Sequence, residues 1–265
     1  MPIVNETFKK FQTLIREESG IHLSDAKKNL LTSRLAKRLR YHGINSYNEY
    51  YRLVHQDDLE LQMMIDIITT NETSFFREVH HFDFLKKFIL PSFNGPLCRV
   101  WSAAASIGAE AYTLAMVLDE VLLPRNITWE VVGTDINTEV IVKAKQALYP
   151  MEHAKTIDKK YLKKYCLKGM NQYEGFFLIS DSLKRNCTFM NANLMYPPSP
   201  QIGQFDVIFL RNMLIYFDNE NKKIIVENVI KALKKGGYLF IGHSESLNKI
   251  TNSVRQVRPT IYIKD

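Results

Sequence analysis

The chain has 265 residues, enough for one large domain or two smaller ones with a sizeable hydrophobic core. Apolar residues make up 46% and charged residues 24%, as in an ordinary globular protein, and no apolar run approaches the ~20 residues of a membrane span. The polar start "MPIVNETFKK" lacks a signal-peptide profile, and three widely spaced cysteines fit neither a disulfide framework nor a zinc site. We therefore expect a cytoplasmic protein with no metal site and no membrane insertion.

An excess of positive charge is concentrated on one short stretch. With 35 basic and 28 acidic residues the formal charge is +7, which predicts acidic partners without naming their class. Residues 27–40, "KKNLLTSRLAKRLR", hold six basic residues and no acid. On a helix, three leucines of this run line one face, and Lys27, Arg34 and Arg38 form a basic stripe beside it. The run predicts either a docking face for an acidic partner or a solvated amphipathic helix.

The first ~70 residues are predicted to be all-helical, because apolar side chains recur at helical spacing. The first such segment runs from Val4 to Ile15, and "SGIHLS" then interrupts the pattern. Ser24 is the expected N-cap of the next helix. Further helical segments are expected over 47–55 and 59–70.

From residue 98 onward, short apolar strands alternate with helical segments, which predicts a mostly parallel sheet with helices on both faces. The expected strands span residues 98–103, 129–136, 187–194, 205–212 and 237–244, and the expected helices span 109–123, 138–148 and 219–235. The final "TIYIKD" is expected to add an edge strand. An irregular insert interrupts this rhythm, and its "YEGFFLIS" is typical of a small hairpin.

The first strand of this region runs through "RVWSAAASIGAEAY" into a helix, at the place where α/β proteins bind nucleotides. A dinucleotide site needs G-x-G-x-x-G so that backbone can press against a pyrophosphate, but this loop holds a single glycine, Gly108. S-adenosylmethionine carries no phosphate; it needs a close backbone approach, an acceptor for its amine and a carboxylate for its ribose. Asp135, which ends the next strand, either supplies that carboxylate or caps the following helix. Glu110 either holds the cofactor or is an acid favoured by the helix dipole.

Two further motifs place polar side chains beside the expected pocket. In "NETSFFRE", Asn71, Thr73 and Arg77 either approach a ligand from the junction of the helical and sheet regions or lie in a surface loop. In "FDVIFLRNMLIYFD", Arg211 and Asn212 directly follow an apolar strand. Polar groups in that position need partners or must reach a cleft, so the arginine is either a ligand-binding residue or a salt-bridged structural one.

Six motifs together resemble the chemotaxis receptor methyltransferases, the CheR-type family: "NETSFFRE", "RVWSAAASIGAEAY", "GTDIN", "NANL", "FDVIFLRNMLIYFD" and "GGYLFIGHSESL". They occur in order over nearly the whole chain. The resemblance implies an α/β fold with a Rossmann-like, S-adenosylmethionine-dependent methyltransferase sheet. It also implies an all-helical, receptor-facing N-terminal domain over 1–72, a cofactor-binding domain over 73–265 and a small β-subdomain insert at about 158–188.

The resemblance further implies transfer of a methyl group from S-adenosylmethionine to glutamate carboxylates on the cytoplasmic helices of chemoreceptors, with S-adenosylhomocysteine as product. The implied cofactor-binding residues are Asn71, Thr73, Arg77, Gly108, Glu110, Asp135, Asn193, Leu194, Arg211 and Asn212. The residues implied to lie nearest the transferred methyl are Arg77, Arg211 and Tyr216. The expected receptor-binding residues are Lys27, Arg34, Lys37 and Arg38. In some members of the family the insert docks the receptor's C-terminal peptide by strand addition. We expect a monomer that binds no nucleic acid.

The chemistry of a glutamate acceptor favours positioning over acid–base catalysis. A glutamate carboxyl with a pKa of about 4.3 is already ionised at neutral pH, so its methylation needs no general base. The transfer does need the carboxylate held in line with the methyl group and shielded from water. An arginine can fix one side of a carboxylate, and Tyr216 can donate a hydrogen bond to the other oxygen.

Ala109 departs from the pattern of the family, which commonly has two acids after the loop glycine and then a proline, where this chain has "AEA". We favour the interpretation that the missing acid is a surface residue near the helix dipole, over the alternative that it contacts the cofactor. "GHSES" is similar to a hydrolase nucleophile elbow, but no histidine follows His243, which excludes that reaction. A nucleic-acid methyltransferase and a non-catalytic cofactor-binding protein remain the alternatives.

Overall fold

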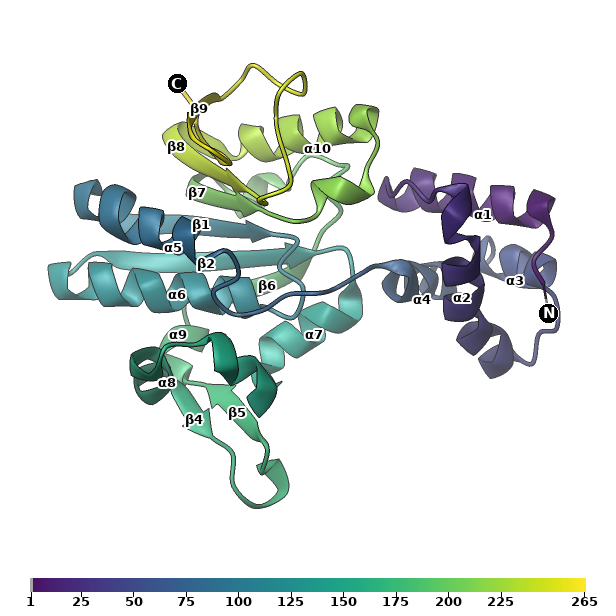
Figure 1. The fold of residues 1–265 in the computed structure, drawn as a ribbon, viewed down its shortest axis with the longest axis horizontal. Helices are drawn as coiled ribbons and strands as arrows, with labels where there is room; N and C mark the ends of the chain where they lie inside the picture. The colour runs from purple at the N-terminus through teal and green to yellow at the C-terminus, as the bar shows by residue number, and fades with distance from the viewer. Residues whose placement is uncertain (1) are drawn as a thin grey trace.

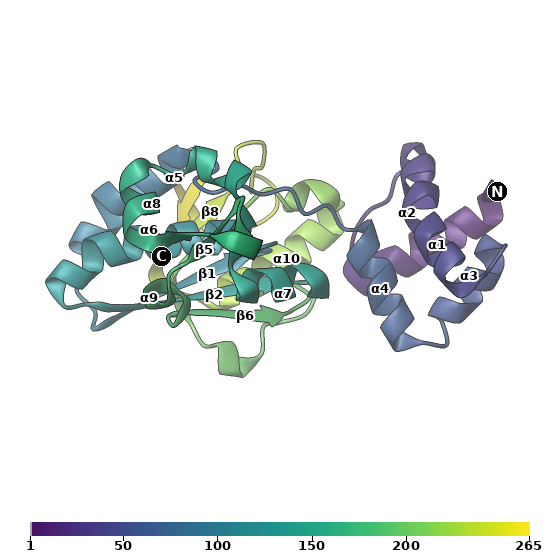
Figure 2. The same cartoon turned by 90° about the horizontal axis from the view of Figure 1, so that it is seen from below.

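The computed structural model describes residues 2–265, which form an N-terminal helical bundle beside a sheet domain (Figures 1 and 2). The helices of the bundle are α1 (Asn5–Ser19), α2 (Lys28–His42), α3 (Tyr47–Val54) and α4 (Asp58–Ile68). Their apolar faces meet in a core of their own, in which Phe11, Leu35 and Tyr50 are fully buried. This confirms the all-helical prediction for the start of the chain.

The entry to α2 differs from the prediction. Ser24 precedes a short 3₁₀ turn, η1 (Asp25–Lys27), and its hydroxyl makes no capping hydrogen bond, so α2 begins only at Lys28. The three leucines of α2 are buried as the spacing predicts, at positions 31, 35 and 39.

The main sheet has seven strands in the order β6-β2-β1-β7-β8-β10-β9. The strands are β1 (Leu97–Ala103), β2 (Thr128–Asp135), β6 (Cys187–Asn191), β7 (Phe205–Leu210), β8 (Leu233–Ile241), β9 (Arg255–Arg258) and β10 (Ile261–Ile263). β1, β2, β6, β7 and β8 run parallel, and the last two strands pair antiparallel. The strand order reverses between β1 and β7, which is where sheets of this kind leave a crevice at the carboxyl ends of the strands. Figure 1 shows those ends facing the helical bundle.

Helices cover both faces of the sheet, as the alternation predicts. Side chains of α5 (Val79–Phe84), α6 (Ala109–Leu122) and α7 (Thr138–Gln146) share one core with one face of the strands. Side chains of α10 (Asn219–Lys231) fill a second core on the opposite face.

Two predictions at the C-terminal end of the sheet are wrong. α10 ends at Lys231, because Leu233 already pairs with β7 and Gly236 takes a left-handed φ of 75° that no helix allows. The final segment is not an edge strand: β10 pairs with β8 on one side, and β9 forms the edge. β9 carries arginine at both ends and no run of apolar residues; charge of this kind protects an exposed edge and also hides the strand in the sequence.

The insert folds as a second, three-stranded sheet in the order β3-β5-β4, seen below α6 in Figure 1. Its elements are β3 (Leu148–Pro150), α8 (Lys159–Tyr165), β4 (Cys166–Lys168), β5 (Phe176–Ile179) and α9 (Asp181–Lys184). The predicted hairpin corresponds to the antiparallel β4–β5 pair, whereas β3 lies before the expected start of the insert. Phe177 is buried in the same core as α6, so the insert is anchored to the main domain.

Hydrogen bonds join the bundle to the sheet domain on both sides of the linker 69–78. On one side, Asp66 Oδ1 accepts from the backbone N–H of Thr138 at 2.9 Å. On the other, Asn221 Nδ2 donates to the carbonyl of Gly20 at 2.8 Å. The bundle therefore lies across the carboxyl edge of the sheet. Within residues 2–265, no helix is both long and apolar enough to cross a membrane.

A buried carboxylate ties the helices of the bundle together. The side chain of Glu60 is 3% exposed and accepts hydrogen bonds from Arg38 Nε at 2.9 Å and from the Tyr50 hydroxyl at 2.6 Å, while His42 Nε2 lies 2.9 Å away. Burial alone would raise the pKa of Glu60, but these hydrogen bonds outweigh it and lower the pKa to about 2.

We expect Glu60→Gln to lower the free energy of unfolding of the bundle by about 3 kcal/mol, because it leaves Arg38 without its charge partner. The pKa of Glu60 is lower in the folded state, so its contribution is complete above pH 4.5 and is lost as the pH falls towards 2. In Glu60→Gln, the fall in the free energy of unfolding between pH 4.5 and 2 that is due to Glu60 should disappear. Urea unfolding followed by far-UV circular dichroism measures both effects, and Glu49→Gln, at an exposed position of α3, is the matched control. Equal losses in the two variants would contradict the assignment.

Candidate active site

A pocket opens between the bundle and the carboxyl edge of the sheet, at the reversal of strand order. Its walls come from the bundle, the linker 69–78, the loop after β1 and the segment after β7. It brings together nine of the residues singled out in the sequence, namely Lys27, Asn71, Thr73, Arg77, Glu110, Asp135, Arg211, Asn212 and Tyr216. Asn193 and Leu194 line a smaller adjoining hollow that shares Asp135 with the main pocket.

The linker is fixed by aromatic packing on the far side of the pocket. Phe75 is fully buried, with its ring centroid 5.0 Å from that of Tyr149. Phe76 and Glu78 take left-handed φ values of 53° and 57°, so the chain turns sharply on either side of Arg77. The hydroxyl of Ser106 donates to the carbonyl of Asn71 at 2.9 Å and holds the linker against the loop after β1.

The loop after β1 owes its shape to three residues with left-handed backbone rather than to a glycine-rich sequence. Ala104, Ser106 and Gly108 have φ values of 64°, 49° and 86°. A Cβ at Gly108 would lie 3.0 Å from the Cβ of Ala144, so only glycine fits there without displacing α7. Gly108 therefore shapes the entry to α6 and does not line the pocket.

Ala109 lies in the hydrophobic core with no exposed surface. Our preference for a surface acid at this position is therefore wrong for this chain. A carboxylate there would be buried among apolar side chains, where it would need a partner.

Asp135 ends β2 with its carboxylate held by two backbone amides. Oδ2 accepts from Ser106 at 2.8 Å and Oδ1 from Asn137 at 2.9 Å. The cap of α7 is Asn137, whose side chain accepts from Val140, so the alternative role of Asp135 as a helix cap is wrong. Burial raises the pKa of Asp135, and the two backbone hydrogen bonds oppose that rise. Each carboxylate oxygen can accept a further hydrogen bond, which leaves capacity for ligand hydroxyls.

The side chain of Arg211 is 1% exposed and is surrounded by opposite charge and aromatic faces. Its Nη2 lies 3.4 Å from Glu78 Oε2, and its Nη1 lies 3.6 Å from Glu110 Oε2. The guanidinium carbon lies 5.4 Å from the ring centroid of Phe82. Burial raises the pKa of Glu110, and the positive charge of Arg211 opposes that rise. Arg211 is therefore a salt-bridged structural residue, and it also lines the pocket.

Glu78 and Glu245 are two site residues that the sequence analysis did not single out. Glu78 Oε1 accepts from Asn212 Nδ2 at 3.0 Å, and Glu245 Oε2 accepts from the backbone N–H of Asn212 at 2.9 Å. Both acids lie inside quoted motifs, directly after Arg77 and within "GHSES". Neither acid is marked by a spacing or a strand end, so the sequence offers no signal for its role. Ser244, the residue considered in "GHSES", is exposed.

The bundle contributes Lys27 to the pocket, opposite Tyr216. The Nζ of Lys27 lies 5.7 Å from the Tyr216 ring centroid, and the carbonyl of Tyr216 accepts from the backbone of His22 at 2.9 Å. Other cations of the basic run have partners inside the chain. Arg34 donates to the carbonyl of Thr69 at 3.1 Å, and Arg38 pairs with Glu60, whereas Lys37 is exposed.

The residues of the pocket fit S-adenosylmethionine. Within residues 2–265, the buried Nε and Nη1 of Arg211 have no hydrogen-bond partner, so they can donate to the carboxylate of an amino-acid ligand. Asp135 offers acceptors for ribose hydroxyls at the adjacent strand end.

Comparison with known proteins assigns both parts of the chain. Residues 6–69 match "CheR methyltransferase, all-alpha domain", and residues 71–263 match "CheR methyltransferase, SAM binding domain". The chain is 35% identical over 257 residues to the chemotaxis protein methyltransferase of Salmonella typhimurium, covering 96% of this chain and 88% of that protein. It is 36% identical to the Escherichia coli protein of the same name (96% and 89% covered) and 34% identical to that of Borreliella burgdorferi (99% and 95% covered). With both domains matched, the chain belongs to the CheR methyltransferase family and is an S-adenosylmethionine-dependent methyltransferase of chemotaxis.

Proposed function

We propose that this protein methylates glutamate side chains in the cytoplasmic domain of a chemoreceptor. The observation that carries the proposal is the meeting of Asp135, Arg211 and Tyr216 in one pocket, next to Lys27 from the basic run. The carboxylate of Asp135 suits the hydroxyls of a nucleoside, and the buried guanidinium of Arg211 suits a negatively charged group. The phenol of Tyr216 can donate a hydrogen bond to an acceptor oxygen.

Each of these residues has a separate task in the proposed reaction. S-adenosylmethionine supplies an electrophilic methyl group on a sulfonium centre. Asp135 accepts from the ribose, and Arg211 binds a carboxylate in the buried part of the pocket. Tyr216 and Arg77 hold the glutamate of the receptor in line with the methyl group. Because that glutamate is already ionised at neutral pH, the site needs no proton acceptor, and its contribution is orientation and exclusion of water.

We expect Tyr216→Phe to lower kcat about tenfold, through loss of one hydrogen bond to the acceptor, while the affinity for S-adenosylmethionine stays unchanged.

We expect Asp135→Asn to weaken binding of S-adenosylmethionine about tenfold or more, because its amide would face the backbone donors of Ser106 and Asn137. Titration calorimetry measures the binding, and transfer of a radiolabelled methyl group to a receptor fragment measures the turnover.

The same assay distinguishes the alternatives. Full activity in both Tyr216→Phe and Arg77→Ala would contradict a positioning mechanism. Label on RNA instead of the receptor fragment would indicate a nucleic-acid methyltransferase. Absence of cofactor binding by the unaltered chain would favour a non-catalytic protein.

We further propose that the exposed side of α2 docks the acidic receptor helices. Lys37 is the exposed member of the four candidate residues, since Arg34 and Arg38 are engaged within the bundle and Lys27 faces Tyr216. The proposed docking surface on α2 therefore offers fewer free cations to the receptor than the sequence suggests.

Lys37→Glu should raise the KM for the receptor fragment about fivefold, an effect that shrinks with added salt, and leave the cofactor affinity unchanged. Lys235→Glu is the matched control, because Lys235 is also exposed but lies near the amino end of β8, away from the bundle. An equal rise in KM for the two variants would point to net charge rather than to a docking face.

The small sheet offers a second contact with the receptor, its C-terminal peptide. β4 forms one edge of this sheet. Leu167 on β4 and Met170 just after it are 57% and 75% exposed. An open edge with apolar neighbours suits an extended peptide added as a fourth strand.

We expect a receptor fragment that keeps its C-terminal peptide to show a lower KM than the same fragment without it. The isolated peptide, added separately, should remove the difference by competition. Equal KM values for the two fragments would exclude a docking role for the insert.

A further inference from the structure

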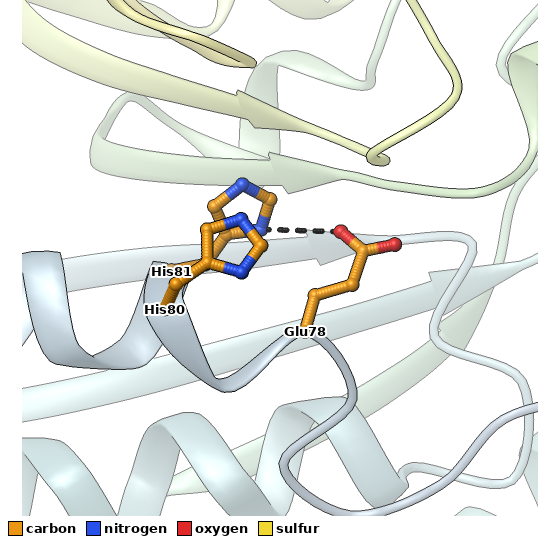
Figure 3. A group of neighbouring side chains, drawn as sticks. All are labelled: Glu78, His80 and His81. Carbon is orange, nitrogen blue, oxygen red and sulfur yellow. Dashed lines mark ion pairs between the residues drawn. The ribbon is translucent and has the colours of Figure 1, made fainter.

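Glu78, His80 and His81 lie together behind the pocket, with the potential ligand atoms of all three within 4.8 Å of one another (Figure 3). The grouping is similar to a metal site, but the carboxylate already has donors on both oxygens. Oε1 accepts from Asn212 Nδ2 at 3.0 Å, and the backbone N–H of His243 lies 3.1 Å from Oε2. The guanidinium of Arg211, 3.4 Å from Oε2, would repel a divalent cation. We therefore interpret Glu78 as a carboxylate that accepts hydrogen bonds and not as a metal ligand.

We propose that Glu78 is a positioning residue, which fixes the Arg211 guanidinium and the Asn212 side chain in the cofactor pocket. The proposal rests on the function assigned above to this pocket. Glu78 reaches both targets at once: one oxygen holds Asn212, and the other lies beside Arg211. No other carboxylate of residues 2–265 pairs with both side chains.

A buried histidine lies directly behind Glu78. His81 is fully buried on α5, with Nε2 2.8 Å from the Thr260 hydroxyl and Nδ1 3.4 Å from Glu78 Oε2, the contact dashed in Figure 3. Burial lowers the pKa of His81 to about 3, so its imidazole is neutral and can donate one hydrogen atom. From its left-handed backbone, Glu78 reaches the side chain of Asn212, just after β7.

Arg211 depends on this carboxylate because burial removes water as an alternative partner. Its positive charge lies between Glu78 and Glu110, which come from different elements, while its Nη2 also donates to the carbonyl of Arg77 at 2.6 Å. Burial would raise the pKa of Glu78, but the hydrogen bond from Asn212 and the charge of Arg211 outweigh it and lower the pKa, so Glu78 stays ionised at neutral pH.

Two variants separate position from charge. Glu78→Gln removes the charge beside Arg211, and we expect it to weaken binding of S-adenosylhomocysteine about tenfold or more. Glu78→Asp keeps the charge but draws it back by one methylene, away from Asn212. Aspartate tolerates a left-handed backbone better than glutamate, so this variant adds no backbone strain, and we expect it to bind the product less tightly.

Asp206→Asn is the matched control. Asp206 lies near the start of β7, the strand that Arg211 follows. Its side chain is 18% exposed against 15% for Glu78, and it also pairs with a cation, Lys234. It should lower the melting temperature as Glu78→Gln does and leave the affinity for S-adenosylhomocysteine unchanged. Calorimetric titration and thermal unfolding of each full-length variant give the two readouts.

A double-mutant cycle with Arg211→Gln tests whether Glu78 acts through Arg211. If it does, the double variant Glu78→Gln/Arg211→Gln binds S-adenosylhomocysteine about as weakly as Arg211→Gln alone. Additive losses, unchanged affinity in Glu78→Asp, or an equal loss in Asp206→Asn would each overturn the proposal. Failure of the unaltered chain to bind S-adenosylhomocysteine would instead contradict the function proposed for the pocket.

Discussion

The Arg211 guanidinium lies almost fully buried at the end of β7, and a charge in that position is stable only beside carboxylates. Those carboxylates come from two other parts of the chain, Glu78 at the end of the linker and Glu110 in the first turn of α6. The ion pairs therefore require that linker, helix and strand be placed together. The same requirement assembles the pocket, because each of these three segments also contributes to its wall.

The resulting site is a polar patch enclosed by apolar structure. Phe75 anchors the linker on the side of the insert, while the rings of Phe82 and Phe209 cover the guanidinium. Backbone amides rather than side chains hold Asp135, so its orientation depends on the shape of the loop after β1. A loop with one glycine achieves this shape because Ala104 and Ser106 accept left-handed turns that the surrounding hydrogen bonds stabilise.

Local pattern predicts most of the fold and those parts of the site that follow strands. β1, β2, β7 and α6 are apolar segments bounded by clear turns, and each was predicted within two residues. β9 was missed because its charged edge has no apolar alternation. The partners of Arg34 and Arg38 could not be predicted from the basic run, because they belong to another helix. Glu60 lies on α4, and Thr69 directly follows it. Glu78 and Glu245 were missed for the same reason: a carboxylate that holds a neighbouring side chain is defined by distance in space, which no spacing in the sequence encodes.

The boundary between bundle and sheet has a consequence for the entry and release of cofactor and product. Each side has its own hydrophobic core, and hydrogen bonds such as Asn221 to Gly20 and Thr138 to Asp66 join them. Polar contacts can be exchanged for contacts with water at little net cost, unlike the packing inside either core. We therefore expect separation of the bundle from the sheet domain to cost less free energy than unfolding of either, which would let cofactor and product leave without unfolding.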